Sequence, residues 1–244
     1  MISAIIFDLD GTLVQTESLK AESYAKAIAA LRPGAVREAD VIAAYDTLIG
    51  YSRDDVVRTL ANRFGVTDTD ALLALRLRIY DQMLADPELL KRQEYPYSTA
   101  LLRQVKRAGY PTGLTTVSHA AQARLVLDAL DLRPYLDVIV TMDDVAHAKP
   151  DPEIYLVAAS RLQVPPTQCL AVEDSLPGVK AALAAGMTCV AIANELTHAS
   201  LHTGPPLSGE HIVDDPRALD GVVSALLHTE RQTDLHPSQP LERA

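Results

Sequence analysis

The sequence contains no tryptophan, two phenylalanines and only two cysteines in 244 residues. Cys169 and Cys189 each lie in a short apolar, strand-like run, so we expect two buried free thiols in a reducing compartment and no disulfide framework. No apolar stretch has the length of a membrane-spanning helix. The apolar N-terminal run is broken by Asp8 and lacks the basic residues of a signal peptide. We therefore expect a soluble, cytoplasmic protein.

Positive charge is also scarce, because 22 lysines and arginines face 32 acidic residues and leave a net charge of −10. This balance argues against a nucleic acid or an anionic membrane as partner. A phosphate site would therefore need a local basic feature. Apolar residues are plentiful, and their 48% share is enough for one large domain or two modest ones.

Residues 16–92 show helical periodicity and no convincing strand. Four apolar stripes have a helical period, and each ends near a glycine or proline. Their residues are Tyr24, Ala27, Ile28 and Leu31; Val41, Tyr45 and Leu48; Val56, Val57, Leu60 and Phe64; and Leu73, Leu77, Tyr80 and Leu84. These stripes predict four helices that pack as a small bundle.

The remainder of the chain alternates between strand-like and helical patterns. Strands are predicted at 5–7, 113–116, 138–140, 169–172 and 188–192, with an edge strand at 212–213 and a last helix over 216–228. Asp151 is the predicted N-cap of the helix that begins at Pro152. Nearly all-apolar strands that alternate with helices indicate an α/β fold with a doubly wound parallel sheet.

The pattern divides the chain into two domains. Residues 1–15 and 93–229 would form the sheet domain, residues 16–92 a helical insertion, and the polar residues 230–244 a disordered tail. The insertion leaves the sheet just after its first strand, at the edge where ligands bind in such sheets. A lid over a site would occupy this position.

Polar side chains follow four of the predicted strands. They are Asp8 and Asp10, Thr116 and Ser118, Lys149, and Glu173 and Asp174. Each alone has an ordinary explanation, as a turn residue, a strand-end hydroxyl, a solvated lysine or a helix cap. Together they converge on the carboxyl edge of one sheet, which predicts an active site. Asp8 and Asp10 point to the same side of the chain, and a bound cation is the usual means of offsetting such repulsion.

These motifs resemble those of the haloacid dehalogenase superfamily. They are Asp8-Leu9-Asp10-Gly11-Thr12, Thr116, Lys149 and Glu173-Asp174. The stretches 173–178 and 149–152, the latter followed by Tyr155, resemble the β-phosphoglucomutase-like branch, and the resemblance extends to about residue 228. It implies a helical cap over a Rossmann-like core, Mg²⁺ and an aspartyl-phosphate intermediate.

The resemblance also implies roles for the residues at the strand ends. Asp8 would attack phosphorus, and Asp10 would act as acid and then as base. Lys149 would neutralise the transferring phosphoryl group while Thr116 donates a hydrogen bond to it. The Mg²⁺ ligands would be Asp8, Asp174 and the Asp10 carbonyl oxygen, with Glu173 left open as a further ligand.

Residues of the insertion are expected to bind the substrate. The stretch 48–54 resembles a loop that covers the substrate in β-phosphoglucomutase-like proteins. Its Arg53 matches a residue that holds the non-reacting phosphate in sugar phosphomutases. An exposed residue at the start of a helix is an equal alternative interpretation of Arg53. Thr16 also fits that pattern, and Arg76 stands where the mutases carry a lysine. Lys20 replaces their histidine, which weakens a mutase assignment. Ser118 is grouped with these substrate-binding residues.

The predicted function is a monomeric, Mg²⁺-dependent phosphatase for a small phosphorylated metabolite such as a sugar phosphate. The alternative is a β-phosphoglucomutase-type phosphomutase, since both share the first half-reaction. A phosphonate hydrolase, with Lys20 as Schiff base, is less favoured because this lysine could be a solvated helix residue. A non-catalytic sugar-phosphate sensor would not need the nucleophile Asp8. Asp10 argues against dehalogenation, because halide release needs no acid.

Overall fold

The computed structural model describes residues 1–49, 53–203, 207 and 209–233. Within them, six parallel strands form one sheet in the order β3-β2-β1-β4-β5-β6. The strands are β1 (Ala4–Asp8), β2 (Thr112–Thr115), β3 (Val138–Val140), β4 (Cys169–Glu173), β5 (Thr188–Ile192) and β6 (Ile212–Val213). The predicted doubly wound sheet is confirmed. Thr116 lies one residue beyond β2 rather than inside it.

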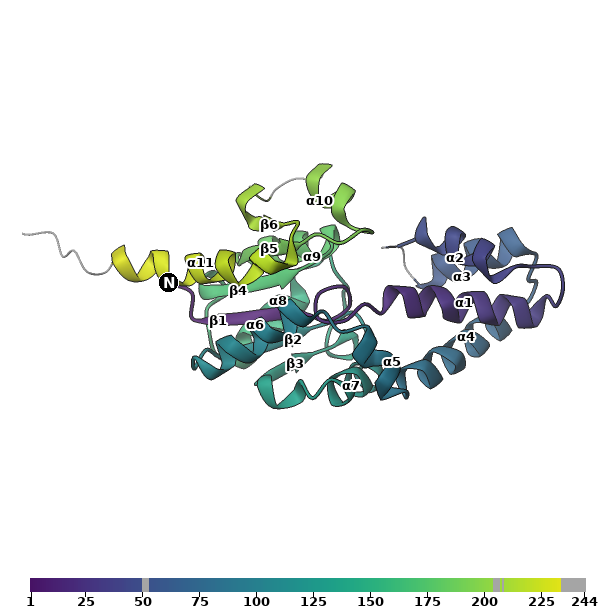
Figure 1. Cartoon of the computed structure of the whole chain (residues 1–244), viewed down its shortest axis with the longest axis horizontal. Helices are drawn as coiled ribbons and strands as arrows, with labels where there is room; N and C mark the ends of the chain where they lie inside the picture. The colour runs from purple at the N-terminus through teal and green to yellow at the C-terminus, as the bar shows by residue number, and fades with distance from the viewer. Residues whose placement is uncertain (50–52, 204–206, 208, 234–244) are drawn as a thin grey trace, which may run out of the picture.

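Helices cover both faces of the sheet (Figure 1). Side chains of β1 alternate between two apolar clusters, with Ile5 and Phe7 in one and Ala4 and Ile6 in the other. The first cluster includes α6 (Pro96–Arg107), α7 (Ala120–Ala129) and α11 (Leu219–Thr233). The second includes α8 (Glu153–Leu162), α9 (Leu176–Ala184) and α10 (His198–Thr203). Burial on both faces explains why the strands are almost entirely apolar.

The helical insertion extends away from the sheet (Figure 1). Its helices are α1 (Glu17–Leu31), α2 (Glu38–Asp46), α3 (Arg53–Phe64), α4 (Thr69–Leu84) and α5 (Pro87–Arg92). The predicted stripes lie in α1–α4, and α1, α2, α3 and α4 share an apolar cluster of their own. Helix α5 is an addition to the four helices predicted for the insertion. Asp86 caps α5 by accepting hydrogen bonds from two backbone N–H groups, and proline suits a first turn.

Two adjacent chain segments connect the insertion to the sheet. The Gln15 N–H donates to the Gln93 carbonyl over 2.8 Å, and the Tyr95 N–H donates to the Leu13 carbonyl over 2.9 Å. Apolar contact is continuous across this connection, because Met83 of α4 belongs to a cluster of the sheet. The exact division into two domains stays a prediction.

Two local predictions differ from the structure. Pro152 is the N-cap residue of α8 in place of Asp151, although the Asp151 carboxylate accepts the Glu153 N–H over 2.9 Å. Helix α11 continues to Thr233, so residues 230–233 are helical and not part of a disordered tail. Residues 234–244 of that tail lie outside the described residues. Both cysteines are buried and free, as predicted. In the described part of the chain, no helix combines the length and apolar character needed to cross a membrane.

Candidate active site

The candidate site lies where the strand order reverses, because the chain passes from β1 to β2 and β3 on one side and then crosses to β4, β5 and β6 on the other. Strand β1 is flanked by β2 and β4, which makes this edge a topological switch point. Asp8 ends β1, and Asp174 follows β4 directly. Gly11 turns the chain here with a φ of +92°, and a Cβ at this position would overlap the Asp174 carboxylate. Glycine therefore allows the two acidic segments to approach closely.

Lys149 connects two of the carboxylates. Its Nζ donates to Asp8 Oδ1 over 2.6 Å and to Glu173 Oε1 over 2.5 Å. Only 6% of its side chain is exposed, so the alternative of a solvated loop lysine is wrong. Burial acts to lower the pKa of Lys149, but Asp8 and Glu173 outweigh it and the pKa is raised. The lysine is therefore held as a cation against the candidate nucleophile.

Glu173 is fully occupied by hydrogen bonds. Besides Lys149, its Oε1 accepts the Tyr155 hydroxyl over 2.7 Å. Its Oε2 accepts the Asp174 N–H over 3.2 Å and the Ser175 hydroxyl over 3.2 Å. These contacts favour Glu173 as the residue that positions Lys149, rather than as a direct metal ligand.

Asp10 points into a separate set of donors. Its Oδ2 accepts the hydroxyls of Thr116 over 3.0 Å and Ser118 over 2.7 Å. Its Oδ1 accepts the Thr16 hydroxyl, and Lys20 Nζ lies 3.7 Å away. Burial acts to raise the pKa of Asp10, but the Lys20 charge and the three hydroxyls outweigh it and the pKa is lowered. Thr116, predicted to donate to the phosphoryl group, donates to Asp10 in this structure.

Three buried carboxylates remain close enough to share a cation. One oxygen each of Asp8, Glu173 and Asp174 lies within 4.8 Å of the others. Burial, followed by the charges of Glu173 and Asp10, raises the pKa of Asp8 to about 7 despite Lys149. Burial and Asp8 raise the pKa of Asp174 well above its usual value. An all-oxygen donor set with excess negative charge fits Mg²⁺, and Asp8 and Asp174 suit it best as ligands.

Of the insertion residues that were predicted to bind substrate, Lys20 and Arg53 differ in whether a contact to the candidate site is seen. Lys20 of α1 reaches the site, since it approaches Asp10 and donates to Glu17 Oε1 over 2.6 Å with only 17% of its side chain exposed. The solvated alternative for Lys20 is therefore wrong. Arg53 is the half-buried first residue of α3, and residues 50–52 of the predicted substrate loop lie outside the described residues.

Arg76 is the most unusual side chain of the insertion. It is 4% exposed, and its guanidinium carbon lies 4.8 Å from the Tyr24 ring centroid and 4.5 Å from that of Tyr80. Its buried Nε has no hydrogen-bond partner within the described residues. Two tyrosine faces stabilise this cation without neutralising it, so it remains available to an anion.

Two residues of the site have no role in the sequence prediction. Tyr155 supports Glu173 from α8, and Asn194 donates its amide to Asp174 Oδ2 over 3.0 Å. Asn194 follows β5 at the same edge of the sheet, so extending the strand-end argument to the fifth strand finds it. Tyr155 belongs to the stretch that resembles the β-phosphoglucomutase-like branch, but the resemblance assigned it no role, and its helical position is equally suited to a core residue.

Comparisons with known proteins agree with this geometry. The family model described as haloacid dehalogenase-like hydrolase matches residues 2–186. Pyrophosphatase PpaX of Bacillus velezensis is 30% identical over 197 residues, which are 79% of this chain and 83% of that protein. The phosphorylated carbohydrates phosphatase of Thermotoga maritima is 33% identical over 187 residues, 76% of this chain and 82% of that protein. A crystal structure of a protein assigned as a β-phosphoglucomutase from Thermotoga maritima has a TM-score of 0.74 at 28% identity, covering 92% of this chain and 100% of the other.

Proposed function

The chain belongs to the haloacid dehalogenase-like hydrolase family, and we propose that it is a Mg²⁺-dependent phosphatase of small phosphorylated metabolites, with sugar phosphates as the preferred class. The observation that carries this proposal is the separation of two nearby carboxylates into different surroundings. Asp8 faces Lys149 and Asp174, whereas Asp10 faces hydroxyls and Lys20. Similarity to phosphatases, one of which acts on phosphorylated carbohydrates, supports the reaction and the substrate class.

In the proposed reaction, a carboxylate oxygen of Asp8 forms a bond to phosphorus as the bond from phosphorus to the ester oxygen breaks. Lys149 holds the Asp8 carboxylate in position and offsets charge on the phosphoryl oxygens. Mg²⁺, held by Asp8 and Asp174, would supply further positive charge to these oxygens. Water then attacks phosphorus, which releases phosphate and regenerates Asp8.

Asp10 is suited to the second step in its present surroundings. Its lowered pKa keeps it ionised, so it can accept a proton from the attacking water. Protonating the leaving oxygen in the first step requires a proton on Asp10. We infer that movement of Lys20 away from Asp10 accompanies that step, because removing this charge raises the Asp10 pKa.

Arg76 favours substrates that carry a second anionic group. Within the described residues, the buried Nε of Arg76 has no hydrogen-bond partner, and a guanidinium with free donors is a strong binding group for phosphate. Both a phosphatase of sugar bisphosphates and a β-phosphoglucomutase-type phosphomutase would use it, so the mutase is the second candidate. The phosphonate hydrolase is less supported. Although burial acts in the opposite direction, Asp10 and Glu17 raise the pKa of Lys20, and a protonated amine cannot form an imine.

A screen of phosphorylated metabolites with the purified protein tests the proposal. We expect phosphate release from sugar phosphates that is lost in chelator and restored by Mg²⁺. Asp8→Asn should lower kcat by on the order of 10⁴-fold or more, because it removes the nucleophile. Phosphate release by Asp8→Asn at the wild-type rate would contradict the covalent mechanism. Faster interconversion of sugar 1- and 6-phosphates than phosphate release would favour the mutase.

A further inference from the structure

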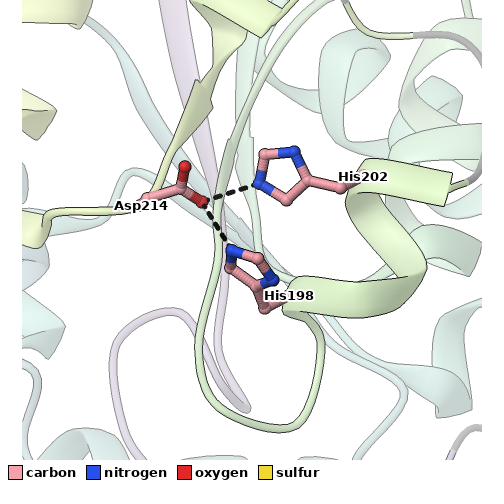
Figure 2. A group of neighbouring side chains, drawn as sticks. All are labelled: His198, His202 and Asp214. Carbon is pink, nitrogen blue, oxygen red and sulfur yellow. Dashed lines mark hydrogen bonds and ion pairs between the residues drawn. The ribbon is translucent and has the colours of Figure 1, made fainter.

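Two histidines and an aspartate gather at a part of the molecule that the proposed reaction does not use. His198 and His202 are four residues apart on α10, so they lie on the same face of the helix, and Asp214 directly follows β6 (Figure 2). Asp214 Oδ1 lies 2.8 Å from His202 Nε2 and 3.6 Å from His198 Nε2. One ligand atom of each residue lies within 4.8 Å of the others.

We propose that His198, His202 and Asp214 form a structural binding site for a divalent transition-metal cation of the Zn²⁺ class. Two imidazole nitrogens and one carboxylate oxygen are typical ligands of such a cation, whereas Mg²⁺ prefers oxygen ligands alone. Tetrahedral bonds of about 2.0–2.1 Å place neighbouring ligand atoms about 3.3 Å apart. The two observed nitrogen–oxygen distances lie on either side of this value, so small side-chain rotations complete the site.

A comparison with a second exposed group on the same chain supports the choice. His147, Asp151 and Glu153 are equally close together, but their carboxylates already accept backbone N–H groups. In contrast, the carboxylate contacts of Asp214 within the described residues are to the two imidazoles. Among the described residues, no backbone N–H therefore competes for the Asp214 carboxylate.

Exposure and position define what the cation does. The side chains of His198, His202 and Asp214 are 59%, 36% and 53% exposed, so solvent molecules fill the remaining coordination positions. The cation would join α10 to the end of β6. His198, the first residue of α10, donates its backbone N–H to the Asn194 carbonyl. The Asn194 side chain in turn donates to Asp174. The site would thus hold in place the connection that carries Asn194.

Calorimetric titration of the full chain with Zn²⁺ tests this site, with Mg²⁺ in large excess to occupy the acidic cluster. We expect the wild type to bind one equivalent of Zn²⁺ more than His202→Ala or Asp214→Asn. If a variant still binds this equivalent, its affinity should be at least about 10–100-fold lower, because losing even an outer-shell partner of a metal weakens binding by that factor. His147→Ala is the matched control and should behave as the wild type. Circular dichroism verifies folding of each variant.

A second measurement does not depend on counting equivalents. Zn²⁺ should raise the thermal midpoint of the wild type and of His147→Ala, because binding to the folded state alone stabilises it. The midpoint of His198→Ala should not rise to the same extent. Equal Zn²⁺ stoichiometry and affinity in the wild type and His202→Ala would overturn the proposal, as would equal losses in His202→Ala and His147→Ala. Neither readout requires phosphatase activity.

Discussion

Asp8 and Asp10 show how far two residues of one motif can differ in protonation. Burial raises the pKa of Asp8 to about 7, while Lys20 and three hydroxyls outweigh burial at Asp10 and lower its pKa. A Mg²⁺ ligand must be ionised, so the proposed metal would compete with a proton at Asp8 and also at Asp174. Asp8 contributes stability to the metal-free protein at acidic pH, which is lost as pH rises through about 7.

Mg²⁺ affinity should therefore rise with pH. Between about pH 5 and the Asp8 pKa of about 7, we expect the Kd for Mg²⁺ to fall about tenfold per pH unit for each proton released. Calorimetry in buffers of different ionisation enthalpy measures both the Kd and the proton release. A Kd that stays constant over this interval would contradict the raised pKa of Asp8.

Glu173→Gln separates the two roles considered for Glu173. If it positions Lys149, the substitution removes a negative charge near Asp8, and the pH midpoint of Mg²⁺ binding moves below about 7. If it is a direct ligand, Mg²⁺ affinity falls by at least about 10–100-fold at every pH. Glu153→Gln is the control. Glu153 accepts the backbone N–H groups of Ala146 and His147, in the segment that precedes Lys149, and it has no part in the proposed site. We expect the first result.

At the scale of elements, the close approach of α9 to the end of β4 shapes the site. Ser175 caps α9, and its hydroxyl accepts the Gly178 N–H over 3.3 Å. A Cβ at Gly178 would overlap the Glu173 carboxylate. The helix start thus confines Glu173 to the orientation in which it accepts from Lys149 and Tyr155.

Gly178→Ala should lower stability by about 1–3 kcal/mol, because a methyl group is forced into a packed space. It should also lower kcat, since Glu173 must move and Lys149 with it. Gly221→Ala is the matched control in α11, where an added Cβ meets no atom within 4 Å. This substitution should raise the free energy of unfolding by up to about 1 kcal/mol. Chemical denaturation and phosphatase assays measure both effects. Wild-type stability and kcat in Gly178→Ala would contradict the proposed confinement.

At the scale of the whole molecule, the helical insertion has an apolar cluster of its own besides the two clusters that cover the sheet. Leu60 is fully buried in the cluster of α1–α4, and Leu170 of β4 is fully buried in one of the two clusters that cover the sheet. Met83 and Leu84 of α4 join the cluster of the sheet. We therefore expect the helical insertion to lose its own core while its base remains packed on the sheet.

Leu60→Ala should lower the free energy of unfolding by about 2–5 kcal/mol. Hydrogen exchange should show which part of the chain is destabilised. We expect faster exchange of amides in α1–α4 and unchanged protection of the strands. Leu170→Ala, with an equally buried leucine, should reduce protection of the strands instead. An even loss of protection across the chain in Leu60→Ala would show that the two cores unfold together.

The fold class and the edge of the sheet that carries the candidate site followed from local patterns. Strand and helix periods describe neighbouring residues, and parallel strands bring their carboxyl ends together whatever the details of packing. Asp8, Lys149 and Asp174 could therefore be placed at one edge before any contact was known. The apolar stripes of residues 16–92 likewise predicted the helices α1–α4.

The pairing of side chains within the site required the tertiary structure. Thr116 and Ser118 are more than a hundred residues from Asp10, and their hydroxyls meet it because β1 and β2 are neighbours in the sheet. Lys20 Nζ lies 3.7 Å from Asp10 Oδ1, a contact that the helical period of α1 does not predict. Arg76 is buried by tyrosines of two helices. Such contacts depend on packing between distant segments, which no local period encodes.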